Sequence, residues 1–215
     1  MYKGIIFDID GTLTSTNELI YASFNHILQK YEGITYSDEQ IIALFGPTEE
    51  QILVRWYPDK AEEVVEEYFD FYKNELPEMA SAYDGIHNLL EIISKKNIPL
   101  GIFTGKGRRA AELTLEGLGL RDYFTYFASG DDVENHKPAA DGIVNYLKTY
   151  NFQPHEVLMI GDAPADIKAA RSAGTPVASV VWDSYAKDEV LKLNSELVFY
   201  SVAGLQEYLL STLPE

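Results

Sequence analysis

Residues 4 to 12 read Gly-Ile-Ile-Phe-Asp-Ile-Asp-Gly-Thr, an apolar run that stops at two aspartates and a glycine. A short β-branched run bounded by turn residues is typical of a buried strand, and we place this strand at Gly4 to Phe7. In an open parallel sheet, ligands bind beyond the carboxyl ends of the strands. The pattern therefore predicts that Asp8 and Asp10 stand at the edge of a ligand site.

Further apolar runs of this kind alternate along the chain with segments of helical spacing. The predicted strands lie at residues 98–103, 123–128, 157–160, 177–181 and, more weakly, 197–200. The predicted helices lie at residues 85–95, 108–118, 139–150, 164–173 and 202–210. Alternation of strand and helix indicates an α/β fold, in which a Rossmann-like parallel sheet is sandwiched by helices.

Residues 15 to 80 break this alternation, because helical periodicity runs through the segment without a convincing strand. The segment holds 14 acidic and 4 basic residues, a balance of −10 out of a formal net charge of −17 for the chain. We predict two domains. Residues 1–14 and 81–215 form an α/β catalytic core domain, and residues 15–80 form an inserted all-helical cap domain.

The composition of the chain indicates which binding partners and which cellular location to expect. A chain of 215 residues with 46% hydrophobic and 24% charged residues is typical of a folded protein with one sizeable core and a smaller module. The net charge of −17 disfavours nucleic acids and anionic membranes as partners, because both require a basic surface. The first apolar run is too short for a signal peptide or a membrane span. We expect a cytoplasmic monomer or homodimer that acts on a small molecule.

Three further groups of polar residues stand at the ends of predicted elements. They are Thr104-Gly105-Lys106 after the strand at 98–103, Lys137-Pro138 before the helix at 139–150, and Gly161-Asp162-Ala163-Pro164-Ala165-Asp166 after the strand at 157–160. Because ligands bind where the carboxyl ends of parallel strands meet, we expect these groups to converge with Asp8 and Asp10 on one rim of the sheet.

Four carboxylates then share one small pocket, those of Asp8, Asp10, Asp162 and Asp166. Left alone they would repel one another and some would protonate, so a divalent cation and Lys137 are needed to keep most of them ionised. The chain has no cysteine, so a metal must be held by oxygen or imidazole. Mg2+ suits ligation by oxygen alone, and the sequence predicts a Mg2+ site.

The same residues can carry out phosphoryl transfer. An ionised Asp8 attacks phosphorus while the metal and Lys137 draw charge from the phosphoryl oxygens. Asp10 protonates the departing alkoxide and then activates the water that hydrolyses the aspartyl phosphate. Thr104 offers a hydroxyl and a backbone N–H to a phosphate oxygen, and Gly11 lets the backbone approach the anion closely. The predicted substrate-binding residues are Gly11, Thr104, Gly105 and Lys137.

The ordered set of motifs resembles the haloacid dehalogenase superfamily, and within it the phosphoglycolate phosphatase-like branch, whose helical cap is inserted after the first strand. The matching motifs are Asp8-Ile-Asp10-Gly-Thr-Leu, Thr104-Gly-Lys, Lys137-Pro and Gly161-Asp162-Ala-Pro-Ala-Asp166. The resemblance implies that Asp8 is the nucleophile and Asp10 the general acid and base. It also implies that Mg2+ is held by Asp8, the Asp10 backbone carbonyl and Asp162, with Asp166 assisting the metal or orienting Lys137.

The leading prediction is a Mg2+-dependent phosphatase that hydrolyses a small phosphomonoester. Candidate substrates are phosphoglycolate, another organic acid phosphate, a sugar phosphate and pyrophosphate. A sugar phosphomutase that resembles β-phosphoglucomutase uses the same motifs and stays open as an alternative, although the cap stretch Phe45-Gly46-Pro47-Thr48 does not look like the arginine-containing loop of those mutases. A phospho-accepting protein or an inactive binding protein of the same fold is the alternative from another class.

Basic residues beside the second motif stay outside the predicted site. Lys106, Arg108 and Arg109 form the basic start of a helix, a pattern that more often gives an exposed face than an anion site. Asp131 and Asp132 are interpreted as turn formers. We expect the cap to close over the core during turnover, because a helical lid excludes water and contacts the leaving group.

Overall fold

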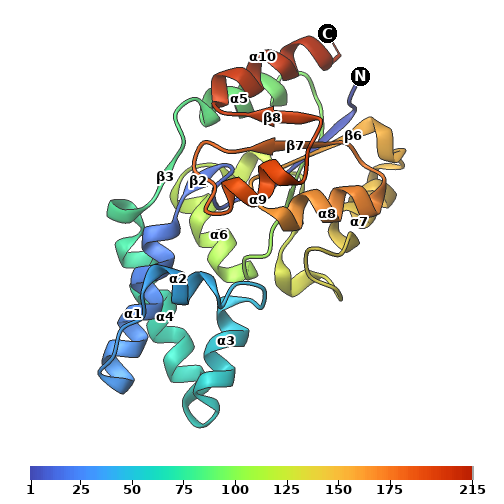
Figure 1. Ribbon diagram of the computed structural model, residues 1–215. Helices are drawn as coiled ribbons and strands as arrows, with labels where there is room; N and C mark the ends of the chain where they lie inside the picture. The colour runs from blue at the N-terminus through green and yellow to red at the C-terminus, as the bar shows by residue number, and fades with distance from the viewer. Residues whose placement is uncertain (215) are drawn as a thin grey trace.

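A six-stranded parallel sheet forms the body of the fold in the computed structural model, which describes residues 1–214 (Figure 1). The strand order is β5-β4-β1-β6-β7-β8. The strands are β1 (Gly4–Phe7), β4 (Leu100–Phe103), β5 (Tyr126–Ala128), β6 (Val157–Gly161), β7 (Val177–Val180) and β8 (Leu197–Phe199). The predicted α/β fold with a parallel sheet is confirmed. Residues 121–123, at the start of the strand predicted for 123–128, form a 3-10 helix instead.

Strand β1 lies between β4 and β6, and its side chains alternate between the two faces of the sheet. Ile5 and Phe7 belong to the core on one face, which α5, α6 and α10 cover, whereas Ile6 belongs to the core that α7, α8 and α9 cover. Burial on both faces explains why the strand sequence is apolar without interruption. The covering helices are α5 (Ile86–Ser94), α6 (Arg108–Gly117), α7 (Asp141–Tyr150), α8 (Pro164–Ala173), α9 (Lys187–Lys192) and α10 (Val202–Thr212).

Four α-helices between β2 and β3 gather at one side of the sheet, in the blue to green part of Figure 1. They are α1 (Asn17–Glu32), α2 (Asp38–Ile42), α3 (Glu49–Trp56) and α4 (Ala61–Met79). Side chains of these helices, among them Phe24, Ile27 and Tyr68, form a hydrophobic cluster of their own, to which the core contributes Ala110 of α6. Thr48 begins α3 with a capping box, in which its hydroxyl accepts from the N–H of Gln51.

A two-stranded antiparallel sheet joins the helical segment to the rest of the chain. Its strands are β2 (Thr14–Ser15) and β3 (Ser81–Ala82), which pair Thr14 with Ala82 and Ser15 with Ser81. The predicted domain boundary between residues 14 and 15 therefore falls within β2. Short 3-10 helices complete the described elements: η1 (Pro58–Lys60), η2 (Arg121–Tyr123), η3 (Gly130–Asp132) and η4 (Pro154–Glu156). No helix within residues 1–214 has the length and apolarity that a membrane crossing requires.

Candidate active site

Three buried carboxylates meet at the carboxyl ends of β1 and β6, and we call Asp8, Asp162 and Asp166 the acidic trio. Each offers one oxygen to a group of atoms that lie within 4.8 Å of one another. Asp8 directly follows β1 and Asp162 directly follows β6, and these two strands are paired in register, Phe7 opposite Ile160. The parallel pairing therefore brings the first and last motifs together, as expected for strand ends at one rim.

Lys137 supplies the positive charge to this cluster. Its ammonium donates to Asp8 Oδ1 at 3.0 Å and to Asp166 Oδ1 at 2.5 Å, and the side chain is buried. Asp166 also accepts from the backbone N–H of Ala163 at 3.0 Å, so both of its oxygens are engaged. Of the two roles implied for Asp166, this geometry favours the one in which it orients Lys137.

The electrostatics of the acidic trio fit a divalent cation. Burial raises the pKa of Asp8 to about 6, although Lys137 opposes the effect. Burial and the neighbouring carboxylates of Asp8 and Asp166 hold the pKa of Asp162 well above its usual range. Asp162 Oδ2 is buried and has no hydrogen-bond partner within the described residues. An unpaired buried carboxylate oxygen beside two further carboxylates is the donor set that Mg2+ or a similar hard cation takes, so the trio can hold a metal ion.

Gly11 lets the first motif pass close to Asp162. Its φ of +74° lies in the left-handed region, which glycine adopts without strain. A Cβ atom added at this position would lie 2.3 Å from Asp162 Oδ2, well inside van der Waals contact. Both the turn and the close approach therefore require glycine, although an anion in contact with Gly11 remains a prediction.

The carboxylate of Asp10 lies apart from the acidic trio. It accepts from the hydroxyl of Thr16 and from the ammonium of Lys106, whose Nζ lies 3.2 and 3.1 Å from the two Asp10 oxygens. Lys106 Nζ also lies 3.5 Å from Glu49 Oε1, at the start of α3. These contacts place Asp10 in a different environment from Asp8, as an acid and base distinct from a nucleophile requires.

The expectation that Lys106 belongs to an exposed helix face is wrong. Its side chain is 1% exposed, and α6 begins only at Arg108. Burial acts to lower the pKa of Lys106, but Asp10, Tyr72 and Glu49 outweigh it and hold this pKa well above its usual range. One signal in the sequence was available: Lys106 follows a predicted strand within the second motif, at the edge of the sheet where ligands bind.

The second motif, Thr104-Gly105-Lys106, offers a phosphate different hydrogen-bond donors from those that the sequence predicted. The backbone N–H of Thr104 donates to Ala128 O at 3.0 Å, because the ladder between β4 and β5 continues one residue beyond the strand. This N–H is therefore not free for a phosphate. The buried hydroxyl of Thr104 accepts from the N–H of Lys106 and keeps its own hydrogen to donate. In the part of the chain that the structure describes, the N–H of Gly105 donates to no protein acceptor.

A cavity of about 260 Å³ joins these groups to the helical segment. Its volume lies just below the range of about 300 to 1,000 Å³ that is usual for small-molecule sites. The core contributes Asp8, Asp10, Thr104, Gly105, Lys106, Lys137, Asp162 and Asp166 to its lining. The helical segment contributes Asn17, Ile20, Phe24, Phe45, Gly46, Pro47, Glu49 and Ile52. Phe45 packs edge-on against Tyr185, with ring centroids 5.8 Å apart, and so links the helical segment to the core at this cavity.

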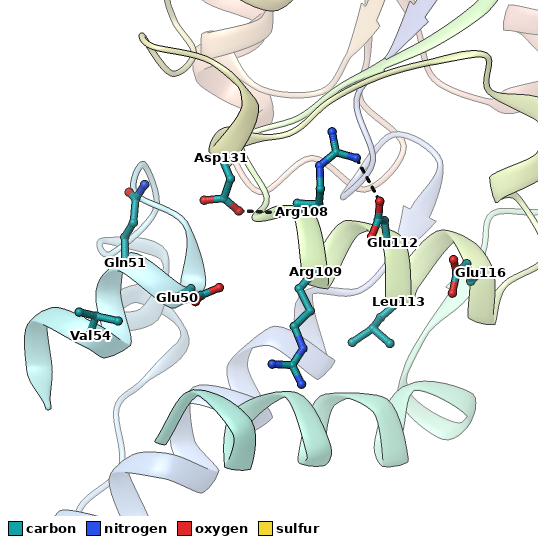
Figure 2. A pocket seen from close by; sticks show the side chains of 9 residues that line it. All are labelled: Glu50, Gln51, Val54, Arg108, Arg109, Glu112, Leu113, Glu116 and Asp131. Carbon is teal, nitrogen blue, oxygen red and sulfur yellow. Dashed lines mark hydrogen bonds and ion pairs between the residues drawn. The ribbon is translucent and has the colours of Figure 1, made fainter. Parts of the chain in front are cut away.

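A more voluminous hollow, of about 670 Å³, opens between α3 and α6 and contains none of the predicted catalytic residues (Figure 2). Its two arginines are already paired, Arg108 with Asp132 and Arg109 with Glu66. The rest of the charged lining is acidic. This hollow therefore lacks the free positive charge that an anionic substrate needs.

Comparison with known proteins places the chain in a family. The family model described as haloacid dehalogenase-like hydrolase matches residues 5–180. The chain belongs to this family. The resemblance to the haloacid dehalogenase superfamily and the expectation of an enzyme of the hydrolase class are both confirmed.

Named relatives of this haloacid dehalogenase-like hydrolase include phosphatases. The pyrophosphatase PpaX of Bacillus pumilus (strain SAFR-032) is 31% identical over 201 residues, which cover 94% of this chain and 93% of PpaX. A predicted phosphoglycolate phosphatase from Haemophilus somnus 129PT matches with a TM-score of 0.82 at 20% identity, over 96% of this chain and 97% of its own. CbbY from Rhodobacter sphaeroides, solved in complex with phosphate, matches with a TM-score of 0.79 at 20% identity. The match covers 95% of this chain and 96% of the CbbY chain. At such identities these two structures establish the shared fold.

Proposed function

We propose that this haloacid dehalogenase-like hydrolase is a Mg2+-dependent phosphatase that forms a covalent aspartyl phosphate, an acyl phosphate, on Asp8. The observation that carries the proposal is the acidic trio with Lys137: three buried carboxylates, one amine 3.0 Å from Asp8, and a buried Asp162 oxygen without a partner. The identity to PpaX over almost the whole chain supports hydrolysis at phosphorus. The proposed substrate is a small phosphorylated metabolite.

The first step forms the phosphoenzyme. A carboxylate oxygen of Asp8 attacks phosphorus, the bond from phosphorus to the leaving oxygen breaks, and Asp10 gives its proton to that oxygen. Lys137 balances charge on the phosphoryl oxygens, and the hydroxyl of Thr104 and the N–H of Gly105 are the proposed donors to them. Asp10, held by Thr16 and Lys106, is placed beside the cavity at the end of β1.

The second step releases phosphate. Water attacks phosphorus and gives a proton to Asp10, and the bond between phosphorus and the Asp8 oxygen breaks, so that orthophosphate leaves and both aspartates return to their starting states. We assign Mg2+ to Asp8, the Asp10 backbone carbonyl and Asp162, with Asp166 orienting Lys137. When bound, Mg2+ supplies positive charge against the phosphoryl oxygens.

The helical segment is proposed to act as a cap that excludes bulk water. Contacts at the start of α3 support this role, since Thr48 Oγ1 donates to Asp131 at 3.0 Å and Glu49 accepts from the N–H of Gly107 at 2.8 Å. Asp131 also accepts from the backbone N–H of Arg108 (Figure 2). The interpretation of Asp131 as a mere turn former therefore misses its contact with the helical segment.

Phosphate release from a panel of small phosphate esters and pyrophosphate, measured with Mg2+ and with EDTA, tests the proposal. We expect release that needs Mg2+ and that Asp8→Asn abolishes. Asp59→Asn, which removes an exposed carboxylate from η1, is the matched control and is expected to keep the parent rate. Equal release by the parent and Asp8→Asn would assign the activity to another site or another protein.

A further inference from the structure

The active-site cavity has two ends of different character, and we propose that its cap end accepts only an uncharged, largely apolar leaving group. In this proposal Glu49 excludes substrates that carry a second negative charge beside the phosphate. The inference rests on the proposed phosphatase function and adds a substrate class to it, the phosphate monoesters of small apolar alcohols.

Apolar side chains make up most of the cap end, by which we mean the lining residues that the helical segment contributes to the cavity. They are Ile20, Phe24, Phe45, Pro47 and Ile52. Ile20, Phe24 and Ile52 are also members of the hydrophobic cluster of the helical segment, so packing fixes them in place. These five side chains offer no hydrogen bond to a carboxylate or to a second phosphate, and the amide of Asn17, which shares this part of the lining, carries no positive charge. Burying either anion against these apolar side chains is unfavourable unless a cation is present to pair with it.

The positive charge nearest to the cap end belongs to Lys106 of the core, and it is already engaged. The Lys106 ammonium lies 3.1 Å from Asp10 Oδ2 and 3.5 Å from Glu49 Oε1. Even when Asp10 carries the proton of the first step, Glu49 still faces this amine. Lys137, the other lysine of the lining, is bound to members of the acidic trio. Neither lysine is left to receive an anion from the leaving group.

Glu49 is the carboxylate of the cap end, and its contacts hold it firmly in place. It is 7% exposed, it accepts from the N–H of Gly107 at 2.8 Å, and it is the first residue of α3, where the helix dipole favours negative charge. Burial raises the pKa of Glu49 on balance, against the opposing effects of Lys106 and of the backbone donors, including the Gly107 N–H. A leaving group with its own carboxylate or phosphate would meet this fixed charge, and such repulsion is a common source of specificity.

The test compares three substrates of the intact enzyme with Mg2+. Isobutyl phosphate and phosphoglycolate have leaving groups with the same number and branching of heavy atoms but differ in charge, and pyrophosphate carries a second phosphate. We expect kcat/KM for isobutyl phosphate to exceed that for each charged substrate by at least about tenfold. In Glu49→Gln, the ratio of kcat/KM for phosphoglycolate to that for isobutyl phosphate is expected to rise by about tenfold or more.

Glu50→Gln is the control, because it removes an equal charge from the next residue of α3, which lines the other hollow, and is expected to leave the ratio unchanged. If Glu49 only fastened α3 to the core, Glu49→Gln would lower all three rates together, and an unchanged ratio in the folded variant would overturn the inference. If the variant does not fold, the parent enzyme decides: equal or faster hydrolysis of either charged substrate refutes the proposal. No Asp8-dependent release from any compound would instead overturn the phosphatase assignment, and this inference with it.

Discussion

Without a divalent cation, the carboxyl of Asp8 makes the folded protein less stable as the pH rises. Burial raises the pKa of Asp8 from 3.8 to about 6. Between these two values the folded chain keeps a proton on Asp8 that the unfolded chain has released. The folded state thus binds more protons, and the free energy of unfolding falls as the pH rises through this window.

The size of the effect follows from the same pKa. A rise from 3.8 to about 6 is equivalent to roughly 3 kcal/mol, at about 1.4 kcal/mol for each pKa unit. Part of this stabilisation is already lost at pH 4.5, so roughly 2 kcal/mol of it is lost between pH 4.5 and pH 8. The carboxamide of Asp8→Asn does not titrate in this range. Relative to that variant, the parent is therefore expected to lose roughly 2 kcal/mol of stability between pH 4.5 and pH 8.

Urea unfolding in EDTA at pH 4.5, 6 and 8, followed by circular dichroism, measures these free energies. Asp59→Asn again serves as the control for the loss of a surface carboxylate. Mg2+ at 100 times its Kd is expected to stabilise the parent at pH 8 by about 2.7 kcal/mol, because the ion binds the ionised carboxylates of the folded state. A stability difference between the parent and Asp8→Asn that stays constant from pH 4.5 to pH 8 would refute the reasoning.

Other substitutions test single contacts of the structure. Gly11→Ala is expected to abolish Mg2+-dependent phosphate release, since its Cβ would lie 2.3 Å from Asp162 Oδ2; activity near the parent level would contradict that geometry. Lys137→Ala leaves buried carboxylates without their amine, so urea unfolding in EDTA at pH 8 is expected to show a loss of about 3 to 5 kcal/mol, and a loss below 1 kcal/mol would argue against the pairing. Tyr68→Phe removes a buried hydroxyl that has no partner within the described residues, and it is expected to stabilise the protein by about 1 kcal/mol. Tyr72→Phe breaks a 2.7 Å hydrogen bond with Thr114 and is expected to destabilise the protein by about 1 kcal/mol. Thermal melts in which Tyr72→Phe is the more stable of the two variants would contradict the assignment.

The sheet could be predicted because each of its strands is recognisable from its own residues. β1 and β6 are buried on both faces, so an uninterrupted apolar run followed by turn residues identifies each of them without knowledge of the other. The strands β2 and β3 carry no such signal, since two residues are too few to show alternation. α9 was missed for a related reason, because six residues with a single buried side chain, Val190, show no helical period.

The rim of carboxylates follows from topology, but the position of Lys106 does not. Once parallel strands are predicted, Asp8 and Asp162 must lie at the same edge of the sheet, whatever the loops do, and the pairing of β1 with β6 then brings them together. Burial of Lys106 depends instead on Glu49 and Tyr72, which α3 and α4 bring to it from the helical segment. No local pattern encodes how that segment packs on α6. For the same reason the sequence predicted a reactive carboxylate more readily than the shape of the space in front of it.

The pairing of β2 with β3 also bears on how such a protein can change over evolutionary time. Thr14 lies opposite Ala82 and Ser15 opposite Ser81, so the helical segment begins and ends at adjacent positions of the chain's core. Neighbouring strands are about 5 Å apart, and any insert whose two ends are that close can be spliced in by recombination. The gene can thus acquire a new helical segment, and with it a new substrate specificity, while the strand order of the six-stranded sheet stays the same.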